Sequence, residues 1–151
     1  MFNKKIFSTL IFFFINAGFM SSPNYKDGVP AIGFQYDSGA AWAVVCTNTP
    51  YGRVPGKMDG RGGVYFPWGW KEHRCNSWDL VHGVLIHHSM PLPANCNPRG
   101  HQNNDNADYY NAVIDGPDGM IPGKASADLR TAWYSYGGRE TPVNSGFYII
   151  C

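Results

Sequence analysis

Charged side chains are scarce in this sequence: Asp, Glu, Lys and Arg make up 15% of its 151 residues, and the formal net charge is +1. The few basic residues form no cluster, which argues against a nucleic-acid-binding protein. Hydrophobic residues nevertheless account for 44% of the chain, so general disorder is excluded. A chain of this length is expected to form one domain with its own core.

Helical periodicity is also missing, because no segment repeats apolar residues with a helical period between recognisable caps. The 18 Gly and 11 Pro are spread along the chain and favour short strands joined by turns. Segments rich in aromatic or β-branched residues and bounded by Gly, Pro or Asp are typical of such strands. They are residues 40–46, 64–68, 109–114, 131–136 and 147–151. The sequence therefore predicts an all-β fold.

The most apolar stretch, residues 6–15, is shorter than the roughly 20 residues that a membrane-spanning helix needs. It follows a basic start and precedes the small residues Ala17 and Gly18, an arrangement typical of a secretory signal peptide. We therefore expect residues 1–18 to be removed and the mature protein to be extracellular, with no stable membrane insertion. Loss of Lys4 and Lys5 would leave 10 of the 12 basic residues against 11 acidic ones, which is still close to neutral.

The expected mature part contains four cysteines, an even number that suits two disulfides in an oxidising compartment. Four cysteines allow three pairings. We expect Cys75–Cys96, because this bond would clamp the Pro- and Asn-rich loop at residues 90–100. Cys46–Cys151 would then tie an early strand to the last one. No free thiol is expected.

Signals for a metal, a cofactor or a catalytic centre are weak. Neither C-x-x-C nor H-x-x-x-H spacing occurs, and the adjacent His87 and His88 would point to opposite sides of a strand. No Ser or Thr follows Gly56-Lys57, as a phosphate-binding loop would require. No Ser-His-Asp or Cys-His arrangement is legible, and only one acidic position repeats along the chain, where a glycosidase needs two carboxylates. We therefore expect no metal, no cofactor and no enzymatic activity.

The mature chain contains an internal repeat. Pro55-Gly56-Lys57 recurs 67 residues later as Pro122-Gly123-Lys124, after an Ala/Val-rich segment in each case. An aromatic segment ending in Gly-x-(Lys/Arg)-Glu follows each copy, at an offset of 68. The copies span residues 31–82 and 100–151, and a Pro/His/Asn-rich linker at 83–99 separates them. Neither copy would bury a core alone, so we expect residues 29–151 to form one β-sandwich with pseudo-twofold symmetry.

Each Pro-Gly pair fits the centre of a type II turn, in which Pro fixes φ and Gly supplies a positive φ. Lys57 and Lys124 would then follow rigid turns and point to solvent. Glu72 and Glu140 end the two aromatic segments. They could pair with these lysines or act as further polar ligands.

These motifs resemble the DM-nine repeat family, whose repeats occur in tandem in small invertebrate lectins and beside pore-forming modules in natterin-like proteins. The resemblance extends over residues 29–151. It implies two intertwined repeats in one β-sandwich, dimer formation in some members, and binding of mannose-type sugars. The family's sugar-binding aspartate and lysine correspond to Asp37 and Lys57 in the first copy and to Asp105 and Lys124 in the second.

An aspartate and a lysine suit a sugar because the carboxylate only accepts hydrogen bonds and the ammonium only donates them. Together they can bind two neighbouring hydroxyl groups of the sugar. An aromatic side chain could cover the C–H face of the ring. Candidates are Trp42, Tyr51, Trp68 and Trp70, although most aromatic side chains of a sandwich belong to its core. For Asp37 alone, capping of a turn is the simpler interpretation.

We therefore expect a secreted lectin that binds mannose-type glycans, and a role in immune or pattern recognition is a further hypothesis. The alternative is a secreted, disulfide-stapled protein-interaction module without sugar binding. A homodimer is compatible with both. A pore-forming protein is not expected, because the repeats occupy the mature chain.

Overall fold

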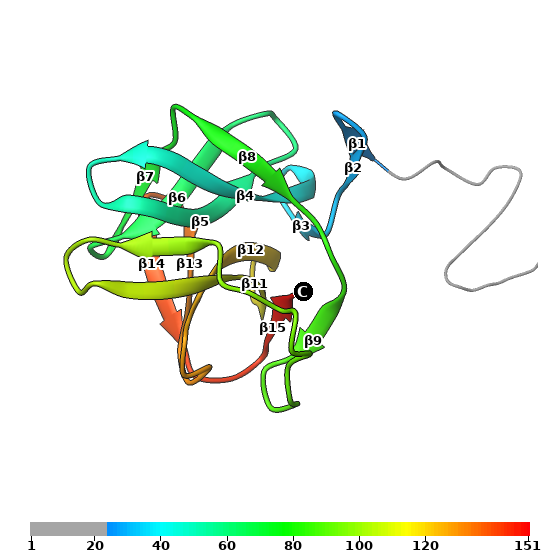
Figure 1. Cartoon of the computed structure of the whole chain (residues 1–151). Coiled ribbons are helices and arrows are strands. Elements are labelled where there is room, and N and C mark those ends of the chain that lie inside the picture. The colour runs from blue at the N-terminus through cyan, green and yellow to red at the C-terminus, as the bar shows by residue number, and fades with distance from the viewer. Residues whose placement is uncertain (1–23) are drawn as a thin grey trace, which may run out of the picture.

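The computed structural model describes residues 24–151, which form strands and no helix (Figure 1). The prediction of an all-β fold is confirmed for this part of the chain. In the same residues no helix is long and apolar enough to cross a membrane. The expected signal peptide at residues 1–18 lies outside the described residues.

Between residues 24 and 151, fifteen strands follow one another. They are β1 (Tyr25–Lys26), β2 (Val29–Pro30), β3 (Gly33–Gln35), β4 (Gly39–Thr49), β5 (Gly52–Met58), β6 (Val64–Trp68), β7 (Lys71–Arg74), β8 (Trp78–Val81), β9 (Leu85–His87), β10 (Gly100–Gln102), β11 (Ala107–Gly116), β12 (Gly119–Ser126), β13 (Ala132–Tyr136), β14 (Arg139–Val143) and β15 (Phe147–Ile150).

Strands from the two halves of the chain pair with one another. β1 and β2 form a small sheet, and the other strands belong to one large sheet. In that sheet β3 pairs with β12, β5 with β10 and β7 with β14, all antiparallel. The pairings from β5 through β6, β7, β14, β13, β12, β11 and β10 return to β5, so these strands form a closed ring. Figure 1 shows β4 to β8 in the upper half of the molecule and β11 to β15 in the lower half.

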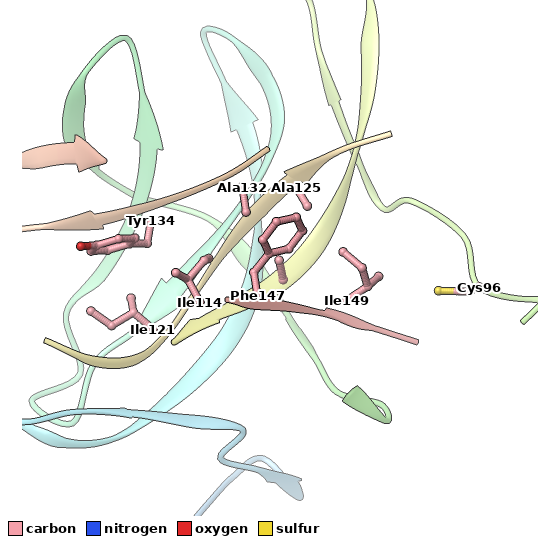
Figure 2. Close-up of a cluster of buried hydrophobic side chains, with 9 residues drawn as sticks. Cys96, Ile114, Ile121, Ala125, Ala132, Tyr134, Phe147 and Ile149 are labelled. Atoms are coloured by element: carbon pink, nitrogen blue, oxygen red, sulfur yellow. The ribbon is translucent and has the colours of Figure 1, made fainter. Parts of the chain in front are cut away.

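The core lies on both faces of the long strands, because successive side chains of a strand point to opposite sides. Val44 of β4 belongs to a cluster of the first half, whereas its neighbours Ala43 and Val45 share a cluster with Val113 and Ile150 of the second half. Figure 2 shows the cluster of the second half, which includes Ile114, Ile121, Tyr134, Phe147 and Ile149. The shared cluster buries apolar surface from both halves and so holds them together.

The two Pro-Gly-Lys motifs lie inside strands β5 and β12, so the prediction of type II turns is wrong. A Cβ atom on Gly56 would lie 2.2 Å from the carbonyl oxygen of Tyr65, and one on Gly123 would lie 2.2 Å from that of Trp133. Glycine is therefore required by the close approach of the neighbouring strand rather than by a turn. As a consequence Lys57 and Lys124 are buried, where solvent-facing lysines were expected.

The disulfides join Cys46 to Cys75 and Cys96 to Cys151. The expectation of two disulfides and no free cysteine is confirmed, but the expected pairs Cys75–Cys96 and Cys46–Cys151 are wrong. The register of β4 against β8 sets Cys46 opposite Trp78. This pairing brings Cys46 close to the segment just before β8, where its Cα atom lies 5.8 Å from that of Cys75.

The position of strand β9 explains the second disulfide. This strand lies within residues 83–99, which were expected to form a linker. β9 pairs with the last strand, β15, so the chain that continues from β9 remains beside the C-terminal residues. The Cα atoms of Cys96 and Cys151 are 4.9 Å apart. The Pro- and Asn-rich loop is thus clamped as expected, but to Cys151 instead of Cys75.

Peptide mapping without reduction is expected to recover Cys46 linked to Cys75 and Cys96 linked to Cys151, because strand register sets both pairs. The measurement is mass spectrometry of a peptic digest made at acidic pH, which prevents disulfide exchange. A reduced sample of the same digest is the control. Recovery of a Cys75–Cys96 peptide would contradict the strand pairing described above.

Candidate functional site

Two buried lysine–glutamate ion pairs form the centre of the candidate site. Lys57 Nζ lies 3.1 Å from Glu72 Oε2, and Lys124 Nζ lies 3.1 Å from Glu140 Oε2. The lysine side chains are only 3% and 4% exposed. The two glutamates were expected either to pair with the lysines or to act as further polar ligands, and the structure shows the ion pairs.

Each lysine also reaches a strand of the other half of the chain. Lys57 on β5 donates a hydrogen bond to the carbonyl oxygen of Ser135 on β13. Lys124 on β12 donates one to the carbonyl oxygen of Pro67 on β6, at 2.8 Å. Burial lowers the pKa of both lysines, and the neighbouring glutamates partly offset this effect on each pKa. The ion pairs therefore belong to the interior that joins the two halves.

The first pocket, here called the Lys57 pocket, has a volume of about 190 Å³. Its lining includes Gln35, Asp37, Lys57, Arg61, Tyr65 and Tyr136. Asp37 lies in the turn between β3 and β4, where its carboxylate accepts hydrogen bonds from the Tyr136 hydroxyl at 2.9 Å and the Gln35 amide at 3.1 Å. Both hydrogen bonds lower the pKa of Asp37, and the one from Tyr136 has the larger effect. The structure thus brings Asp37 and Lys57 into one pocket.

The second pocket, here called the Lys124 pocket, has a volume of about 320 Å³. Its lining includes Trp68, Trp70, Gln102, Asp105, Lys124 and Trp133. Asp105 lies in the turn between β10 and β11 and accepts a hydrogen bond from the hydroxyl of Tyr109. Burial and this carboxylate raise the pKa of Tyr109, so its hydroxyl remains a donor. Asp105 and Lys124 therefore share a pocket as well.

The two lysines differ in the number of N–H donors left for a ligand. An ammonium group has three. Lys57 donates one hydrogen bond, to Ser135, and forms an ion pair with Glu72, so at least one of its N–H groups has no acceptor among residues 24–151. Lys124 has an acceptor for each donor: Glu140, Pro67 and the side-chain oxygen of Gln102 at 2.6 Å. Of these two lysines, Lys57 therefore retains a free ammonium donor within the described part of the chain, and Lys124 does not.

The glutamines that reach the two lysine sites also differ. Gln102 Oε1 accepts a hydrogen bond from Lys124. Gln35 Oε1 is buried in the Lys57 pocket and has no hydrogen-bond partner among residues 24–151. A buried polar atom without a partner is costly, so a donor supplied by a ligand would stabilise this site.

Aromatic side chains surround each ammonium group. Lys57 Nζ lies 5.4 Å from the ring centre of Tyr136, and Lys124 Nζ lies 5.4 Å from that of Trp133. Strand β6 contributes Tyr65 to the Lys57 pocket and Trp68 to the Lys124 pocket. Strand β13 contributes Tyr136 to the Lys57 pocket and Trp133 to the Lys124 pocket. Each of these strands therefore lines both pockets.

Two of the four aromatic candidates named from the sequence, Trp68 and Trp70, line the Lys124 pocket. Trp42 instead belongs to the core, where its indole N–H donates to the carbonyl oxygen of Val29. Tyr51 stacks on Trp68, with ring centres 3.7 Å apart, but lines a different pocket, together with Phe66 and His73.

Sequence reasoning missed several pocket residues, although the repeat offset could have found them. Gln35 and Gln102 differ by 67 positions, as Lys57 and Lys124 do. Tyr65 with Trp133 and Trp68 with Tyr136 differ by 68, the offset of the two glutamates. A search for polar and aromatic residues at these two offsets would have identified these six pocket residues.

Within residues 24–151 no group of three or more His, Cys, Asp or Glu side chains is arranged to hold a metal ion. No protein-family model matches the chain, and no curated protein matches its sequence.

Proposed function

We propose that this protein is a carbohydrate-binding protein that takes a mannose-type sugar in the Lys57 pocket. The observation that carries the proposal is the meeting of the Asp37 carboxylate with a free donor of Lys57 in one small polar pocket. Asp37 would accept hydrogen bonds from sugar hydroxyls and Lys57 would donate one.

Other features of the pocket favour a sugar over an anion or an apolar ligand. Gln35 Oε1 is a buried acceptor without a partner among the described residues, and a hydroxyl would supply its hydrogen bond. The rings of Tyr65 and Tyr136 line the same pocket and can cover the C–H face of a pyranose. Its three carboxylates, those of Asp37, Asp59 and Glu72, outnumber its two cations and so disfavour a phosphate or carboxylate ligand.

We propose binding without hydrolysis. A glycosidase needs a carboxylic acid whose pKa is raised so that it can protonate the leaving group. Hydrogen bonds lower the pKa of Asp37 instead, and Glu72 is held in an ion pair with Lys57. This arrangement suits an acceptor of hydrogen bonds rather than a general acid.

We further propose that the chain consists of two intertwined DM-nine-type repeats in one β-sandwich domain over residues 29–151. The pairing of β3 with β12 has its counterpart in that of β10 with β5, and the bond from Lys57 to Ser135 has its counterpart in that from Lys124 to Pro67. The two disulfides support a mature protein in an oxidising, extracellular compartment.

A glycan array probed with the mature chain, with calcium and with a chelator, tests the proposed function. Binding of mannose-terminated glycans that survives the chelator is the expected result. Binding to no glycan would refute the proposal and would favour the alternative, a secreted protein-interaction module.

Replacement of Asp37 by Asn is expected to weaken binding of methyl α-mannoside by about 1.5–3 kcal/mol, the contribution of a hydrogen bond to a charged group. Calorimetric titration measures this loss. Asp37 is exposed, so the free energy of unfolding should change by less than about 1 kcal/mol.

Asp128→Asn is the matched control. Asp128 is also an exposed turn aspartate that accepts a hydrogen bond from a hydroxyl group, Ser126 Oγ at 2.6 Å, but it lines neither pocket. Its replacement should leave the affinity unchanged. Full affinity in Asp37→Asn would show that the sugar does not bind to this carboxylate.

A further inference from the structure

The same backbone turn borders both pockets but carries different residues. Gly69 and Trp70 connect β6 to β7, and Gly137 and Gly138 connect β13 to β14. All four have a positive φ: 62° and 69° in the first turn, 61° and 83° in the second. The backbone N–H of Trp70 donates to Glu140 Oε1 at 2.8 Å, and that of Gly138 donates to Glu72 Oε1 at 3.1 Å.

Tryptophan is an unfavourable residue for this position. A positive φ suits glycine, and for a bulky residue it is a rare conformation that raises the free energy of the folded state. Gly138 shows that the turn forms with glycine, with the same type of hydrogen bond. The side chain of Trp70 is 70% exposed, so core packing does not compensate for the unfavourable backbone. Backbone strain of this kind is common at ligand-binding positions.

The exposed ring of Trp70 lies at the Lys124 pocket, together with Trp68 and Trp133. The Lys57 pocket has Tyr136 and Tyr65 in the places of those two tryptophans and no aromatic side chain in the place of Trp70. Its volume is about 190 Å³, against about 320 Å³ for the Lys124 pocket. Because Lys124 has no free donor, a ligand in its pocket must gain more from stacking on aromatic rings.

We infer that Trp70 is a stacking platform that adds a second ring position to the Lys124 pocket. This pocket then binds saccharides of at least two linked rings, whereas the Lys57 pocket binds a single terminal ring. The inference rests on the proposed function, since it assigns a ligand class to the second of the two sugar pockets. One ring would lie between Trp68 and Trp133 and donate hydrogen bonds to Asp105, and the next would lie on Trp70.

The test compares methyl α-mannoside with a two-ring mannobiose in an NMR titration of the tryptophan indole N–H signals. These signals report on the Lys124 pocket directly, because its lining contains three tryptophans and that of the Lys57 pocket contains none. The wild-type protein should bind mannobiose at this pocket about tenfold more tightly than the monosaccharide, a difference of about 1.4 kcal/mol.

Trp70→Gly reproduces the Gly-Gly turn of the other half, so it should fold with an unchanged or higher melting temperature and lose the tenfold preference. Trp70→Phe keeps an aromatic platform and should retain most of it. Trp78→Ala removes an exposed tryptophan that lines neither sugar pocket and should leave the preference intact.

Three outcomes overturn the inference: equal affinity for the two sugars in the wild-type protein, a preference that survives in Trp70→Gly, or indole signals that remain fixed while monosaccharide binds elsewhere. In all three cases the proposed function at the Lys57 pocket still stands. Absence of binding of either sugar to either pocket would instead refute the proposed function itself.

Discussion

Replacement of Lys57 by alanine is expected to lower the free energy of unfolding by about 3–5 kcal/mol, because it leaves Glu72 nearly buried without its cation. The carbonyl oxygen of Ser135 loses its donor as well. For a domain of this size the melting temperature should fall by about 10–20 °C. Urea denaturation followed by tryptophan fluorescence measures the free energy, and calorimetry measures the melting temperature.

Lys71→Ala is the matched control. Lys71 precedes Glu72 on β7, but its side chain is exposed and forms no ion pair within residues 24–151. Its loss should change the free energy of unfolding by no more than about 0.5 kcal/mol. A similarly small change for Lys57→Ala would mean that the buried ion pair is not required for stability. Any sugar-binding measurement on Lys57→Ala must therefore be made under conditions in which the variant is folded.

Removal of the disulfide between Cys96 and Cys151 by double replacement with alanine is expected to lower the free energy of unfolding by about 4 kcal/mol. This bond closes a sequence separation of 55 residues, so its loss greatly increases the freedom of the unfolded chain. Removal of the bond between Cys46 and Cys75, which spans 29 residues, should have a slightly smaller effect.

Urea denaturation of the two double variants, compared with the oxidised wild-type protein, tests this order. The wild-type protein in reducing buffer is the control, and it should be less stable than either variant because it lacks both bonds. An equal stability of the Cys96/Cys151 variant and the wild-type protein would contradict the role assigned to the bond between the loop at residues 90–100 and the C-terminus.

Local patterns sufficed to predict the all-β class and several strands. The segment predicted at residues 64–68 coincides with β6, and those at 40–46 and 109–114 lie within β4 and β11. These strands are rich in aromatic or β-branched side chains and end at glycine or polar residues, which are local features. The grouping of Asp37 with Lys57 was implied by the resemblance to the DM-nine repeats, whereas local patterns alone favoured a turn-capping role for Asp37.

Other features depend on contacts that are distant in the sequence. Pro55-Gly56 was interpreted as a turn because both residues are rare in strands, yet the nearby backbone of Tyr65 makes glycine necessary inside β5. The burial of Lys57 depends on Ser135, which lies 78 residues away. Disulfide partners depend on strand register, which cysteine spacing does not specify.

The sharing of β6 and β13 by both pockets limits how this protein can evolve. A displacement of β6 would move Tyr65 in one pocket and Trp68 in the other, so a mutation that reshapes one pocket through its strands would disturb both. The turns beyond these strands are free of this restriction, because each borders a single pocket. Specificity can therefore diverge between the two pockets at the turns without loss of the common frame, as the pair Trp70 and Gly138 illustrates.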